Sequence, residues 1–106
     1  MIMYLYCIAS DVNSEDHIFA ESFDEAAEFA VIWWKREGIE LGKFSVAQVN
    51  PKYLDDLCQR HLKIALNEGV KGMGDYIRSK GWVVEPIEIG SDQPFWNPQV
   101  HHVRDD

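Results

Sequence analysis

SFDEAAEFAVIWWKREG, at residues 22–38, is the stretch that decides the fold of this 106-residue chain. Ser22 and Glu25 form a capping box, in which the Ser hydroxyl accepts from a backbone N–H and the Glu carboxylate reaches back. Acidic residues in the first turn and Lys35 and Arg36 in the last complement the helix dipole. Because Gly38 provides a natural stop, the pattern predicts a helix that begins after Ser22 and ends before Gly38.

This helix has one continuous apolar stripe at the i, i+3, i+4, i+7 spacing, which predicts that it packs on a sheet. Three further apolar residues, Phe29, Ile32 and Trp33, fall on a flank beside the stripe and continue round its back. A second element or another molecule must cover them. The stripe consists of Phe23, Ala26, Ala27, Ala30, Val31 and Trp34.

Strand patterns surround the helix. Residues 2–9 are apolar on both alternating faces, which places this strand in the middle of a sheet. Residues 17–21 form a short strand, expected to pair with it in antiparallel fashion. Residues 43–49 and 82–89 are two more strands, and Pro86 places the last one at an edge because proline cannot donate a ladder hydrogen bond.

A second helix is predicted from Asn50-Pro51, as N-cap and first residue, to about Asn67, and residues 73–80 could form a short third helix. The order ββαβα(α)β indicates an α+β domain of two layers. We expect a mostly antiparallel sheet of three to four strands with both long helices on one face, which leaves the other face free to bind. The domain would span residues 1–90, and residues 91–106 would form an extended tail.

Charge is unevenly distributed along the chain. Residues 11–40 carry nine acidic and two basic residues, a net charge of −7, residues 41–80 carry +3, and residues 81–106 carry −4. The total of −8 argues against direct nucleic-acid binding or an anionic membrane as the main partner, because phosphate binding requires a concentrated basic surface. A polarised acidic surface instead favours a basic protein partner, or simply solubility.

The compartment expected from the sequence is the cytoplasm. No apolar run approaches the roughly 20 residues of a membrane span, and the N-terminus lacks the pattern of a signal peptide. Cys7 and Cys58 fit neither a zinc spacing nor a secreted disulfide framework, which favours reduced thiols, although the sequence leaves a single bridge between them open.

Three patterns could carry chemistry, and each has a plainer explanation. Cys58 and His61 lie on one apolar helix face and make half a metal site at most, so a core role is favoured. His101 and His102 are adjacent in the tail and would point to opposite sides. The glycine-rich run 69–74 contains Lys71 and could bind an anion, but it matches no phosphate-binding motif. We therefore expect no catalytic residue, cofactor or metal.

The favoured hypothesis is a small non-enzymatic protein-binding module whose acids engage a basic surface. One version is an inhibitor that blocks the nucleic-acid-binding surface of its partner, with carboxylates in place of phosphates. The alternatives are a homodimeric structural domain that buries the Trp33 flank, and a small anion- or nucleotide-binding enzyme that uses the Gly69–Gly74 loop. Acids and aromatic anchors together give the predicted partner-binding residues: Asp11, Glu15, Asp16, Glu21, Glu28, Phe29, Ile32 and Trp33.

Overall fold

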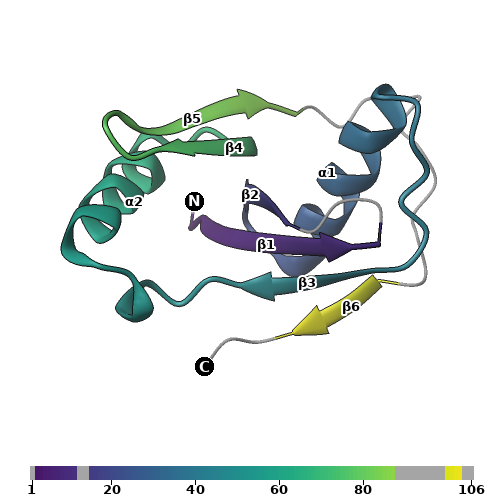
Figure 1. Ribbon diagram of the computed structural model, residues 1–106, viewed down its shortest axis with the longest axis horizontal. Helices are drawn as coiled ribbons and strands as arrows, with labels where there is room; N and C mark the ends of the chain where they lie inside the picture. The colour runs from purple at the N-terminus through teal and green to yellow at the C-terminus, as the bar shows by residue number, and fades with distance from the viewer. Residues whose placement is uncertain (1, 12–14, 88–99, 104–106) are drawn as a thin grey trace.

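The computed structural model of the chain is a small α+β domain with a central sheet and two long helices (Figure 1). It describes residues 2–11 and 15–87 and the backbone of residues 100–103. The elements are β1 (Tyr4–Ser10), β2 (Asp16–Ala20), α1 (Phe23–Arg36), β3 (Phe44–Gln48), a 3-10 turn η1 (Pro51–Tyr53), α2 (Asp56–Glu68), β4 (Gly72–Ile77), β5 (Gly81–Pro86) and β6 (Val100–Val103). No helix in these ranges is both long and apolar enough to cross a membrane.

The sheet is larger than the sequence predicts. The strand order is β5-β4-β2-β1-β3-β6, in which the first five strands are antiparallel to their neighbours and β6 runs parallel to β3. The central place of β1, its antiparallel pairing with β2 and the edge position of β5 are confirmed. Residues 100–103, expected in an extended tail, pair with β3, and the rest of the segment 91–106 lies outside the described residues.

Helix α1 forms as its capping signals predict. The Glu25 N–H donates to Ser22 Oγ over 3.1 Å, and the Glu25 carboxylate accepts from the N–H of Glu21 over 2.8 Å. At the other end Gly38, with φ of 78°, completes a Schellman turn in which the Ile39 N–H donates to the Trp34 carbonyl over 2.8 Å. The helix therefore extends from Phe23 to Arg36.

The prediction that both helices cover one face is wrong. On β1, Tyr6 and Ile8 belong to the cluster under α1, whereas Leu5, with Met3 just before the strand, belongs to a second cluster with Leu62 of α2. Since alternate residues of a strand point to opposite faces, the two helices cover opposite faces of the sheet. They also lie toward opposite ends of the molecule (Figure 1). The physical reason is the apolar character of both faces of β1, each of which needs a cover.

The second half of the chain departs from prediction in two places. Asn50 caps only the short turn η1, and α2 begins five residues later than predicted, where the Asp55 carboxylate accepts from the Cys58 N–H over 2.8 Å. The predicted third helix at residues 73–80 is the strand β4, which pairs with β2 and β5. Gly72 and Gly74 disfavour a helix, and pairing with β2 and β5 fixes the segment as a strand.

Gly74 leaves room for two aromatic rings that cross the β4 backbone. A Cβ atom at this position would lie 2.8 Å from Cε2 of Phe19 and 3.0 Å from Cε3 of Trp82. The Phe19 and Trp82 rings meet edge-to-face with centroids 5.2 Å apart, and Phe19 is fully buried. The absence of a side chain at Gly74 thus allows Phe19 and Trp82 to pack together in the core under α2.

We expect Gly74→Ala to lower the free energy of unfolding by about 1–3 kcal/mol, because the methyl group overpacks rigid rings. Without this clash, replacing glycine by alanine in a strand interior would raise the free energy of unfolding. The sign of the change therefore shows whether the clash exists. Urea unfolding measures the change. Phe19→Leu should cost less in the Gly74→Ala background than in the wild type, and an equal or greater cost there would contradict this packing.

Candidate functional site

The acids of the predicted partner-binding set do not share one surface. Asp11, Glu15 and Asp16 lie at the end of the sheet where β1 gives way to β2, and Glu21 follows the opposite end of β2. At 3.2–3.4 Å per residue the length of β2 separates Asp16 from Glu21 by about 17 Å. Glu28 lies on α1, near neither end.

Two of these acids have partners inside the molecule on different faces of the sheet. The Trp34 Nε1–H donates to Asp16 Oδ2 over 2.7 Å, which ties the C-terminal half of α1 to β2. Glu15 instead lies near His17, whose Nε2 is 3.2 Å from Glu15 Oε1. Asp16 therefore has a structural role, and Glu15 belongs to a different cluster.

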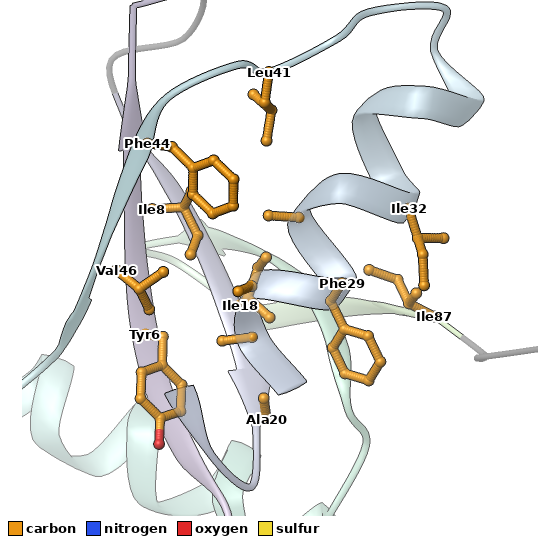
Figure 2. Packing of buried hydrophobic residues seen from close by; sticks show 13 residues of the cluster. Tyr6, Ile8, Ile18, Ala20, Phe29, Ile32, Leu41, Phe44, Val46 and Ile87 are labelled. Atoms are coloured by element: carbon orange, nitrogen blue, oxygen red, sulfur yellow. The ribbon is translucent and has the colours of Figure 1, made fainter. Parts of the chain in front are cut away.

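The prediction of exposed apolar anchors on α1 is wrong for Phe29 and Ile32. Their side chains are 2 % and 8 % exposed and form part of the core beneath α1. Figure 2 shows Ile87, which follows β5, beside Phe29 and Ile32. Trp33 is partly buried against the same core, and the Arg36 guanidinium lies 5.6 Å from its ring centroid. Ile87 and the rest of the core beneath α1 thus cover the part of this flank that Phe29 and Ile32 form.

A smaller acidic surface remains at the N-terminal half of α1. Lys71 Nζ lies 2.8 Å from both Glu21 Oε2 and Glu25 Oε2, and these hydrogen bonds raise the pKa of the lysine. Asp24 is exposed and Glu28 is half-buried on the next turn. We call Glu21, Asp24, Glu25 and Glu28 the acidic N-terminal surface of α1.

An aromatic pair, Tyr4 and Tyr6, borders this surface. Tyr4, 37 % exposed, pairs in register with Ala20, the residue before Glu21. Its ring meets Tyr6 edge-on at 6.3 Å, and Tyr6 in turn meets Phe23, the first residue of α1, at 5.0 Å. The alternation of residues 2–9 places Tyr4 and Tyr6 on one face of the strand, but it does not show which of the two stays exposed.

The structural premise of the anion-binding alternative is wrong. Gly72 and Gly74 lie within β4, not in a loop between two helices. Lys71, the cation of that run, is already bonded to two carboxylates. An anion would have to displace both of them.

The pair Cys58 and His61 is joined by a tyrosine from the sheet. The Cys58 thiol donates to the Tyr76 hydroxyl over 3.4 Å, and this hydroxyl lies 2.8 Å from His61 Nδ1. The hydrogen bond with Cys58 is the largest cause of the raised pKa of Tyr76. Cys58 is half-buried and hydrogen-bonded, so it is not the apolar core residue that the sequence predicted.

Charged groups complete this second cluster at the start of α2. Arg78 Nη1 donates to Asp55 Oδ2 over 3.1 Å and lies 3.8 Å from Cys58 Sγ. The hydrogen bonds with Cys58, followed by the one from Arg78, lower the pKa of Asp55 to about 2. Asp55 thus stays ionised at neutral pH as the helix cap and the partner of the guanidinium.

Cys7 is part of a third cluster, with Glu15 and His17, on the face of the sheet opposite α1. The ligand atoms of the three residues all lie within 4.8 Å of one another. Burial, followed by the charge of Glu15, raises the pKa of the Cys7 thiol to about 11. Cys7 and Cys58 are both free thiols, so the bridge that the sequence left open is absent.

No protein-family model, curated protein or solved structure matches this chain. Its function must therefore be argued from its own residues.

We expect Cys7 to react slowly with iodoacetamide in a Cys58→Ser variant kept free of metal by a chelator. With a pKa of about 11, only about one thiol in a thousand is ionised at pH 8, against roughly a quarter for an unperturbed cysteine. Because the folded-state pKa is raised, the rate should climb about tenfold per pH unit up to pH 10. Mass spectrometry of the alkylated protein gives the rate.

Glu15→Gln should accelerate this alkylation severalfold, because it removes a negative charge that opposes the thiolate. A Glu28→Gln variant provides the control, with the same change of charge on α1. A Cys7 rate at pH 8 equal to that of free cysteine would contradict the assigned environment.

Proposed function

We propose that the protein is a small acidic binding module that engages a basic surface of another protein. The observation that supports it is the gathering of four carboxylates at the N-terminal half of α1, beside the exposed ring of Tyr4. Lys71 is paired with two of them, Glu21 and Glu25, which leaves this surface a net charge of −3. Charge of one sign on one part of a surface attracts a partner of opposite charge and accelerates the encounter. A half-exposed tyrosine next to it supplies apolar contact area.

The binding residues of this proposal differ from those predicted. Glu21 and Glu28 are kept from the predicted set. Asp24 and Glu25 replace Asp11, Glu15 and Asp16, and Tyr4 and Phe23 replace Phe29, Ile32 and Trp33. Asp24 and Glu28 are one helical turn apart, which spaces their Cβ atoms by about 5–6 Å. Rows of carboxylates on a rigid helix are suited to basic side chains that otherwise hold phosphates, so a nucleic-acid-binding protein remains the proposed class of partner.

The homodimer alternative has less support. It required an exposed flank of Phe29, Ile32 and Trp33, and the first two are core residues of the single chain. The cytoplasmic location stays a prediction.

The test is charge reversal on α1 with a matched control. Asp24→Lys/Glu28→Lys should slow association with the partner more than tenfold at low salt and flatten its salt dependence. Glu37→Lys/Glu40→Lys changes the net charge equally at the other end of α1, and it should have a much smaller effect.

The partner is first obtained by affinity capture from the native host, and association rates are then measured by surface plasmon resonance at low and high salt. Circular dichroism confirms that each variant is folded. Equal association rates for wild type and both variants, or equal slowing by both pairs, would contradict the proposal.

A further inference from the structure

Cys7, Glu15 and His17 are brought together by the pairing of two central strands. Cys7 on β1 and His17 on β2 are direct partners in the antiparallel register, so their side chains share one face of the sheet. Glu15 precedes β2 by one residue, with its Oε1 3.2 Å from His17 Nε2. Cys7 precedes Glu15 by eight positions and His17 by ten, and the strand register brings it to the other two.

The spacing of these atoms is close to what a tetrahedral metal ion requires. Zinc bonds of about 2.3 Å to sulfur and 2.0–2.2 Å to nitrogen or oxygen place neighbouring ligand atoms about 3.4–3.6 Å apart. The three ligand atoms already lie within 4.8 Å of one another. Side-chain rotations that move the ligand atoms by about 1 Å therefore suffice for all three to coordinate one ion.

The combination of ligands indicates which ion would bind. A thiolate selects thiophilic metals over Mg²⁺ and Ca²⁺, and imidazole and carboxylate are both common ligands of Zn²⁺. Asp16 adds a further negative charge that acts on the Cys7 thiol. This local excess of negative charge favours a divalent cation.

The site is both held in place and open to solvent. β1 and β2 are the two central strands that carry it, and the His17 ring meets Trp82 edge-on at 5.5 Å. Helix α2 covers the same face at the other end, around Met3 and Leu5, and so leaves Cys7 partly exposed. Glu15 is exposed, so an ion can enter directly from water.

We propose that Cys7, Glu15 and His17 form a binding site for a divalent transition-metal cation, Zn²⁺ in particular. Three protein ligands leave the fourth tetrahedral position for water, as in metal sites that act on a bound molecule. The proposal concerns the face of the sheet away from α1, and it is independent of the acidic N-terminal surface of α1.

The experiment is titration of the metal-free, reduced protein with Co²⁺ and competition by Zn²⁺. Co²⁺ bound through Cys7 should give thiolate-to-metal charge-transfer absorption in the near ultraviolet, which Zn²⁺ abolishes. Cys7→Ser should remove this absorption, and His17→Gln and Glu15→Gln should each weaken Co²⁺ binding more than tenfold. Thermal unfolding without metal shows whether each variant is folded.

Two control variants keep the proposal falsifiable. Cys58→Ser/His61→Gln removes the other neighbouring thiol and imidazole, and His101→Ala/His102→Ala removes the adjacent histidines of the C-terminal segment. Both should bind Co²⁺ with unchanged affinity and spectrum. Absence of thiolate absorption in the wild type, its retention in Cys7→Ser, or its loss in either control variant would overturn the assignment.

Discussion

The structure depends on the burial of both faces of β1. Its alternate residues are apolar on either side, so neither face can be left in water without a large loss of hydrophobic free energy. Tyr6 and Ile8 take their cover from α1, and Leu5 takes its cover from α2 with Phe19. A sheet with a helix on each face follows from this one strand, as does its position between β2 and β3.

The two helices divide the surface into regions of different character. Helix α1 covers the face that bears Tyr6 of β1 and Phe44 of β3, and its outer surface bears carboxylates in its N-terminal half. Helix α2 packs near the start of β1 and toward β5, and it leaves the end of β1 near Cys7 less covered. The acidic surface and the thiol cluster are thus separated by the sheet itself.

Local signals predicted the parts of the fold that local physics controls. The Ser22–Glu25 cap, the Gly38 stop and the pairing of the first two strands needed only neighbours in sequence, and all three are confirmed. The strand β4 was missed because its conformation comes from pairing with β2 and β5, which local propensity does not encode. The sequence identified the excess of acidic residues. It did not show that Glu15 and Asp16 point to opposite faces of the sheet, which the structure reveals.

The sequence by itself determined the α+β class, the central apolar strand, the capped amphipathic helix and the excess of acidic residues in the first third of the chain. Only the tertiary structure decided which residues are left to act. It buried Phe29 and Ile32 in the core beneath α1, beside Ile87, and it placed Cys7 opposite His17 with Glu15 alongside. The reason is that strand register and helix placement are set by long-range burial, which no short window of sequence contains.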